Sequence, residues 1–120
     1  MAKELMMTDL VEVLEKAEKE ANKEATRYFT DVLKGKDSFP CGFAWVDIKS
    51  YNGVRITGNT KVGKLLKQAG VEQSHDRKFQ LWMPGRFGAQ NVDVAVAGCQ
   101  GASMVLEDAG FEVDYGSRWD

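Results

Sequence analysis

The sequence predicts an α+β fold: a two-layer sandwich of one small sheet with helices on one face, plus a long amphipathic helix at the N-terminus. The main observation is a helix-ending phrase that occurs twice, at 66–72 and at 106–112. In each copy an Ala-Gly pair is followed by an apolar residue and an acid. The Gly can adopt the left-handed conformation that ends a helix, and the apolar residue after it begins a strand. Helices and strands therefore alternate along the chain, as expected for a helix layer on a sheet.

The composition is that of one globular domain. The 120 residues are 43% hydrophobic and 28% charged, and they include no apolar stretch long enough to span a bilayer. Two cysteines, Cys41 and Cys99, are too few for a disulfide framework, so we expect reduced thiols in a cytosol. These cysteines and the single histidine, His75, form no pattern typical of a metal site or a nucleophile–base pair. We therefore expect no catalytic residue, no metal and no cofactor.

Helical spacing of apolar residues predicts the first element, a helix over 9–33. Asp9 is the expected N-cap, with Glu12 as the second half of a capping box, and Gly35 ends the helix. Between residues 15 and 27 the only apolar side chains are three alanines, which bury little area. This stretch therefore either packs closely against another backbone or projects into solvent as an arm.

The alanine positions form a seam along one face of this helix, which would suit a partner helix from a second copy. We accordingly divide the chain into 1–34, a long helix acting as an arm or oligomerisation element, and 35–120, a single α+β domain. The alternative is a solvated surface helix that is anchored only at its two ends. The residues expected at the oligomer interface are Leu10, Leu14, Ala17, Ala21, Ala25 and Tyr28.

The rest of the chain predicts four strands and two helices. Aromatic and β-branched residues dominate 42–48, which is typical of a strand, and an Asn-Gly pair at 52–53 favours a hairpin turn into 54–57. Gly98 and Gly101 lie inside the last expected helix and predict a close approach to the sheet or to another helix. The other expected elements are a helix at 60–69, a strand at 79–83, a helix at 92–109, a strand at 111–115 and a polar tail at 116–120.

Charge is distributed unevenly along the chain. Residues 34–86 carry ten Lys/Arg and four Asp/Glu, a net of +6, whereas 1–33 and 87–120 carry nets of −3 and −5. A basic middle can attract an anion such as a nucleotide or nucleic acid. The alternative is that oppositely charged segments face each other within the fold or across a subunit interface.

Two segments favour phosphate binding. Gly58–Leu65 matches the first part of a P-loop, but Leu65 replaces the hydroxyl residue that would hold magnesium, so NTP hydrolysis is not expected. Lysines at the start of that helix would still attract a phosphate, unless they are simply solvated. The loop at 85–91 ends at a second helix start, where Asn91 would either bind a ligand or merely cap the helix. The candidate ligand-binding residues are Lys61, Lys64, Arg77, Lys78, Arg86, Gln90, Asn91 and Arg118.

Aromatic residues also cluster in the basic middle. Phe43, Trp45, Phe79 and Trp82 are interleaved with basic residues, as on a stacking surface for single-stranded nucleic acid. Because alternate strand residues face opposite sides, we interpret most of these aromatics, Phe43 and Trp45 among them, as core.

Several short motifs resemble those of small bacteriophage-encoded proteins of unknown function. They are Phe43-Ala44-Trp45-Val46, the Gln-Asn pair at 90–91, Ala109-Gly110 and the closing Ser117-Arg118-Trp119-Asp120. The resemblance covers residues 40–120, and Asn91 departs from the serine expected there. It implies a phage setting, in the host cytoplasm or in a virion, and carries no catalytic residue.

The sequence thus predicts a non-enzymatic, phage-type accessory protein. Its expected role is that of a self-associating binding module for a phosphate-bearing ligand, a nucleotide or nucleic acid, and it is not expected to bind membranes. The alternative is a structural or virion protein, or a host-protein interaction module, that acts through the N-terminal helix.

Overall fold

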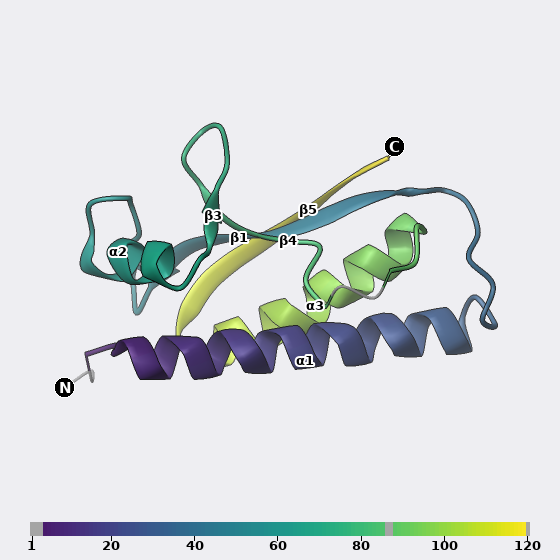
Figure 1. The fold of residues 1–120 in the computed structure, drawn as a ribbon, viewed down its shortest axis with the longest axis horizontal. Coiled ribbons are helices and arrows are strands. Elements are labelled where there is room, and N and C mark those ends of the chain that lie inside the picture. The colour runs from purple at the N-terminus through teal and green to yellow at the C-terminus, as the bar shows by residue number, and fades with distance from the viewer. Residues whose placement is uncertain (1–3, 86–87, 120) are drawn as a thin grey trace.

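The computed structural model of the chain describes residues 4–85 and 88–119 and has the predicted α+β architecture (Figure 1). None of the helices in these two segments is both long enough and apolar enough to cross a membrane. The elements in chain order are α1 (Met7–Asp31), β1 (Gly42–Tyr51), β2 (Val54–Arg55), α2 (Lys61–Gln68), β3 (Glu72–Gln73), β4 (Phe79–Trp82), α3 (Val92–Asp108) and β5 (Phe111–Trp119).

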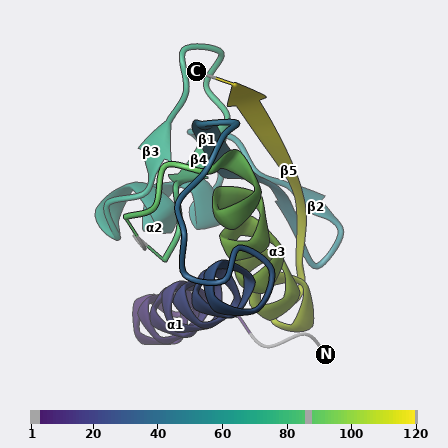
Figure 2. The same ribbon diagram turned by 90° about the vertical axis from the view of Figure 1, so that its right-hand side faces the viewer.

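The sheet is antiparallel and built around β1. Residues 45–48 of β1 pair with both β4 and β5, so these two strands lie on opposite sides of β1. Val46, for example, is opposite Leu81 on one side and opposite Tyr115 on the other. The hairpin strand β2 extends the β4 side, and β3 pairs with β4 beyond it. Strand β5 therefore forms one edge of the sheet (Figure 2).

Helices α1 and α3 cover one face of the sheet, as predicted (Figures 1 and 2). Burial alternates along β1, and the buried residues are those that face the helices. Gly42, Ala44, Val46 and Ile48 are buried, whereas the residues between them are more exposed. We call the other side of the sheet the open face, because no helix covers it in the described part of the chain. It carries the outward-facing residues of β1 and of the strands beside it.

Helix α1 packs along α3 rather than projecting as an arm. Its alanine seam is buried, with Ala17 and Ala21 fully inaccessible, and it faces two glycines of α3. A Cβ atom added at Gly101 would lie 2.6 Å from the Glu20 carbonyl oxygen, and one at Gly98 would lie 3.6 Å from that of Ala21. The expected close approach of backbones thus occurs within one chain.

Because of this packing, the alanine seam cannot be the interface with a second copy that the sequence predicted. Leu10 and Ala25 are buried with the seam, and α3 of the same chain occupies the face that a second copy would need. Leu14 and Tyr28 are half-buried at its borders. Self-association stays a prediction, but it requires a different surface.

Several elements differ from the expectation. Helix α1 begins at Met7, so Asp9 is not the N-cap, and its carboxylate instead accepts a hydrogen bond from the Met6 N–H at 3.1 Å. Strand β5 continues to Trp119 through the segment expected to be a polar tail. Strand β3, which follows the first Ala-Gly phrase, is only two residues long, and β2 is shorter than expected.

Candidate functional site

The predicted ligand residues lie in two groups near opposite ends of the molecule. One group belongs to α2 and the loop before β4, and the other lies near the start of α3 and the end of β5 (Figure 1). The first contains Lys61, Lys64, Arg77 and Lys78, and the second contains Gln90, Asn91 and Arg118. Arg86 lies outside the described residues. The structure therefore does not bring the predicted set together in one site.

Asn91 is the N-cap of α3, which is the alternative that the sequence left open. Its side-chain oxygen accepts hydrogen bonds from the N–H groups of Asp93 (2.8 Å) and Val94 (3.3 Å). Its side-chain amide donates to the Ser38 carbonyl at 2.7 Å, and the residue is 1% exposed. The carboxylate of Asp37 accepts hydrogen bonds from the backbone N–H groups of Gln90 and Asn91. Asn91 is thus committed to the fold and is not free to bind a ligand.

Two lysines of α2 are also engaged locally. Lys61 forms an ion pair with Glu4, and Lys67 donates to the Gly58 carbonyl at 3.2 Å. The helix itself is capped by Thr60, whose hydroxyl accepts a hydrogen bond from the Gly63 N–H. Thr60 thus occupies one N–H group at the start of α2, and Lys61 and Lys67 have partners within the chain.

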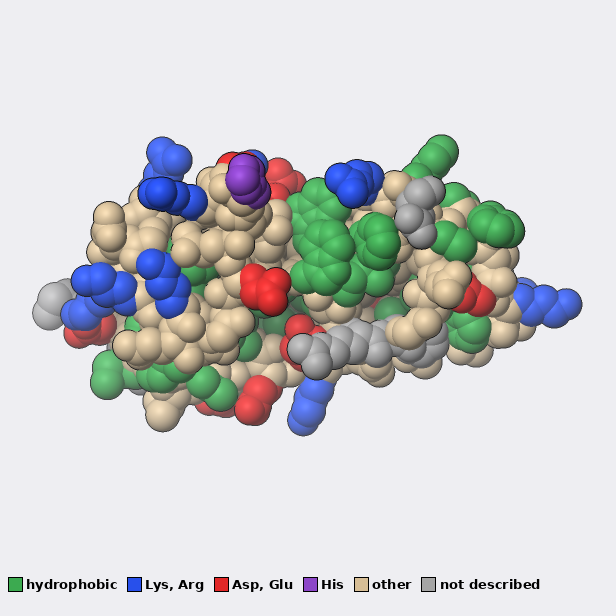
Figure 3. Space-filling view, turned by 45° about the horizontal axis from the view of Figure 1, so that its top comes forward, with side chains coloured by type: hydrophobic (Ala, Val, Ile, Leu, Met, Phe, Trp, Pro, Cys, Tyr) green, Lys and Arg blue, Asp and Glu red, His purple; other side chains and the backbone are tan. Residues whose placement is uncertain are grey.

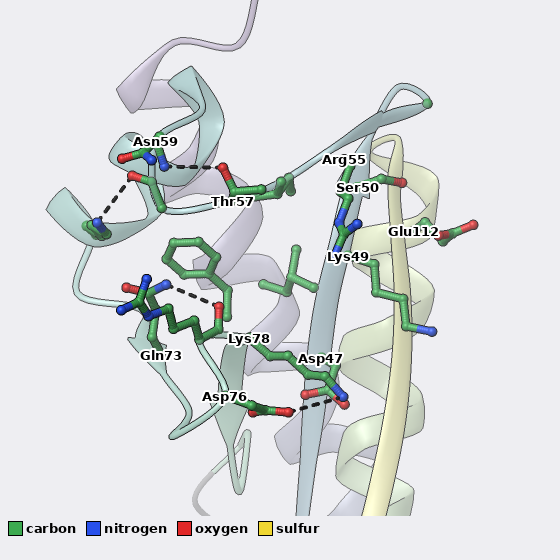
Figure 4. Close-up of a pocket in the computed structure, with 17 residues that line it drawn as sticks. Asp47, Lys49, Ser50, Arg55, Thr57, Asn59, Gln73, Asp76, Lys78 and Glu112 are labelled. Atoms are coloured by element: carbon green, nitrogen blue, oxygen red, sulfur yellow. Dashed lines mark hydrogen bonds and ion pairs between the residues drawn. The ribbon is translucent and has the colours of Figure 1, made fainter.

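A polar hollow of about 1000 Å³ lies between α2, the β1–β2 hairpin and the loop before β4 (Figure 4). Ile56 and Phe79 contribute apolar lining, and both are largely buried. Five cations line the hollow against three acids, which leaves a net of two positive charges. The cations are Lys49, Arg55, Lys67, Arg77 and Lys78, and the acids are Asp47, Asp76 and Glu112.

Two of the acids in the hollow have close partners. Asp47 accepts a hydrogen bond from the Gln80 side-chain amide at 2.8 Å. Asp76 accepts one from the Ser74 hydroxyl, which lowers the pKa of its carboxyl group, and it lies 3.5 Å from the Lys78 ammonium. Figure 4 shows Lys78 extending toward both acids. Arg77, which the sequence predicted as a ligand residue with Lys78, also lines the hollow.

An aromatic platform, made of Phe43, Trp45 and Trp82, lies on the open face beside the hollow. The Trp45 and Trp82 rings stack at a centroid separation of 5.6 Å and an angle of 6°, and Phe43 stacks on Trp82 at 5.7 Å. Trp82 is 51% exposed. Figure 3 shows hydrophobic side chains gathered on this side of the molecule, with a basic side chain next to them.

Gly116 explains how the platform fits on the sheet. It lies opposite Trp45 on β5, where a Cβ atom would come within 2.8 Å of the indole ring. The absence of a side chain lets the indole lie over the backbone of β5. Arg118, two residues further along, is opposite Phe43 and places a cation beside the platform.

The core interpretation of the aromatics is right for Phe79 and wrong for Phe43 and Trp45. Phe79 is 1% exposed and faces the helices, whereas Phe43 and Trp45 are half-buried on the open face. Their alternation was visible in the sequence, but large aromatic residues ordinarily mark the covered side of a strand. The signal for the opposite assignment was the pair of small residues, Gly42 and Ala44, because α3 lies close to this end of β1.

The platform and the hollow are continuous along β1. Phe43, Trp45, Asp47 and Lys49 are its successive outward-facing residues, and the last two line the hollow. Lys49 also pairs with Asp114 of β5 at 3.2 Å. One extended ligand can therefore contact both features.

The chain was compared with protein-family models, curated proteins and solved structures. None of the three comparisons gave a match. The geometry of the site is thus the basis for assigning a function, together with the phage resemblance as an expectation.

The two cysteines lie in different surroundings. Burial raises the pKa of the Cys99 thiol to about 12, with the nearby Glu18 adding to the shift, so this thiol stays protonated in the core. Cys41 lies 3.8 Å from the Gln90 side-chain oxygen. Within residues 4–85 and 88–119, no three His, Cys, Asp or Glu side chains gather to hold a metal ion.

Proposed function

We propose that this chain is a non-enzymatic, phage-type accessory protein that binds single-stranded nucleic acid across the open face of its sheet. The observation that carries the proposal is the stack of Phe43, Trp82 and Trp45, in which Trp82 is 51% exposed. Unpaired bases stack on such rings, and each stacked base contributes about 1–3 kcal/mol. A duplex keeps its bases stacked on one another and cannot use the platform in this way.

The cations of the hollow supply the second half of the interaction. A strand lying along β1 would place bases on the platform and its next phosphates beside Lys49, Arg77 and Lys78. Contacts between cations and phosphates release counterions, so affinity falls as salt rises. The predicted phosphate-bearing ligand is kept in this proposal. Of the residues expected from the sequence, Arg77 and Lys78 line the hollow and Arg118 lies beside the platform.

The alternative role as a structural, virion or host-protein interaction module stays a prediction. The buried side of α1 is occupied by α3, and its outer side is rich in exposed Lys and Glu. No contact in the described residues favours a partner there. Placement in the host cytoplasm or in a virion follows from the phage resemblance and belongs to the same proposal.

Replacing Trp82 with Ala is expected to weaken binding to a fluorescent oligothymidylate by about ten- to a hundredfold, the loss of one stacked base. Trp45→Ala should have a similar effect. Fluorescence anisotropy of the full chain measures the affinity, and a duplex of the same length should bind more weakly. Phe39→Ala is the matched control, because Phe39 is 87% exposed and lies outside the sheet.

A second variant separates phosphate binding from stacking. Arg77→Ala with Lys78→Ala should reduce the slope of log affinity against log salt by about 0.7 for each phosphate that the protein no longer neutralises. The Trp82→Ala chain should keep the slope of the original chain. An original chain that binds neither single-stranded DNA nor RNA at low salt would refute the proposed function.

A further inference from the structure

Strand β5 has a free edge. It pairs with β1 along nearly its whole length, and no other strand of the described residues pairs with its second side. Its nine residues include no Pro and no Lys, two residue types that commonly protect exposed edges. Such an edge is a template for adding another strand.

Backbone groups of alternate β5 residues point to this free edge. Ala44 of β1 directs its C=O and N–H toward Met83, on the side away from β5. Its β5 partner, Ser117, therefore belongs to a pair whose backbone groups point apart. By alternation, the N–H and C=O groups of Val113, Tyr115 and Ser117 face outward. The Tyr115 N–H fits this assignment, because it donates to the neighbouring Asp114 carboxylate at 3.2 Å instead of to β1.

We propose that β5 pairs antiparallel with β5 of a second copy, with Tyr115 opposite itself. This register uses the whole strand and aligns the outward-facing backbone groups of Tyr115 with each other. It also pairs Val113 with Ser117, so that each contact occurs twice in a two-fold symmetric dimer. The sheet then continues from one copy to the next.

Charge complementarity favours this register over its neighbours. With Tyr115 at the centre, Glu112 of each copy lies opposite Arg118 of the other, in the pair type whose side chains are closest. Both side chains are exposed, and neither has an ion-pair partner among the described residues. Shifting the centre to Asp114 would instead place the two Asp114 carboxylates opposite each other. Centring on Gly116 would leave the first residues of β5 unpaired.

The helix side of the strand supplies apolar contact. Tyr115 points toward α3, where its hydroxyl accepts a hydrogen bond from the Gln100 side-chain amide at 3.1 Å. Met104 lies one turn further along the same face of α3 and is 60% exposed, while Tyr115 is 42% exposed. The two-fold axis would bring both residues of one copy near those of the other, which would cover exposed apolar surface.

This inference does not rest on the proposed function, because its test needs no nucleic acid. The full chain is expected to have twice its 13.4 kDa mass in sedimentation equilibrium. Arg118→Glu places two pairs of like charges across the interface and should raise the dimer dissociation constant by about tenfold or more. The double variant Glu112→Arg with Arg118→Glu restores opposite charges and should restore the dimer. Lys36→Glu, in an exposed loop, makes the same charge change away from β5 and should leave the dimer intact.

Cysteine cross-linking tests the register directly. Only a residue opposite itself is close enough to form a disulfide with its own copy. Under mild oxidation Tyr115→Cys should therefore cross-link, whereas Ser117→Cys, as well as the original chain with Cys41 and Cys99, should not.

Each of three results would overturn the inference. The first is an original chain that is monomeric at every concentration. The second is a dimer that both Arg118→Glu and Glu112→Arg leave intact. The third is a charge-swapped double variant that stays monomeric although its circular dichroism and melting temperature match those of the original chain.

Discussion

Replacing Gly101 with Val is expected to lower the free energy of unfolding by about 3 kcal/mol. A Cβ atom at this position would lie 2.6 Å from the carbonyl oxygen and 3.0 Å from the carbonyl carbon of Glu20. Both are backbone atoms of α1, so the clash can be relieved only by moving one helix away from the other. Removing a glycine from a helix interior gains at most about 1 kcal/mol of propensity, so the clash decides the sign.

Urea denaturation followed by circular dichroism measures this loss. Glu107→Val is the matched control, because it places the same side chain at an exposed position of α3 and should change stability by less than about 1 kcal/mol. A Gly101→Val chain as stable as the original would mean that α1 is not seated on α3.

Replacing Asn91 with Ala is expected to cost about 2–3 kcal/mol of stability. The substitution removes the acceptor for the Asp93 and Val94 N–H groups and the donor to the Ser38 carbonyl. Loss of an N-cap costs about 1 kcal/mol, and leaving buried polar groups without partners costs about 1–3 kcal/mol. Thermal and chemical unfolding report the change.

Asn91→Ser separates the two contributions. A serine hydroxyl can still cap the helix. It is too short to replace the hydrogen bond that the Asn91 side-chain amide donates to the Ser38 carbonyl. It should therefore lose only about half as much stability as Asn91→Ala. Equal losses in the two variants would show that capping contributes nothing at this position. Unchanged stability in both would contradict the structural role of Asn91.

Much of the fold could be predicted from local patterns. The two Ala-Gly phrases do end α2 and α3, and the Asn-Gly pair does turn β1 into β2. The last residues of β5 were missed because Gly116 and Ser117 have weak strand preferences. They are held in place by pairing with distant β1 residues, which no local pattern shows.

The site was harder to predict because it depends on which face of β1 is covered. Large aromatic residues such as Phe43 and Trp45 are ordinarily expected in the core. Here the small residues face inward, since α3 lies so close that a Cβ at Gly42 would come within 2.9 Å of Val92. The surroundings of the charged residues could not be predicted either, because they depend on contacts between distant parts of the chain. Lys61 forms an ion pair with Glu4, whereas Arg77 lines the hollow.

The paired indoles also have a practical consequence. Trp45 and Trp82 are two of the three tryptophans in the chain, and their rings are nearly parallel at 5.6 Å. At that separation their electronic transitions couple, so the near-ultraviolet spectrum of the protein carries a signature of this one contact. Anything that inserts between or covers the rings alters that signal and the intrinsic emission, so the platform reports its own occupancy without an added label.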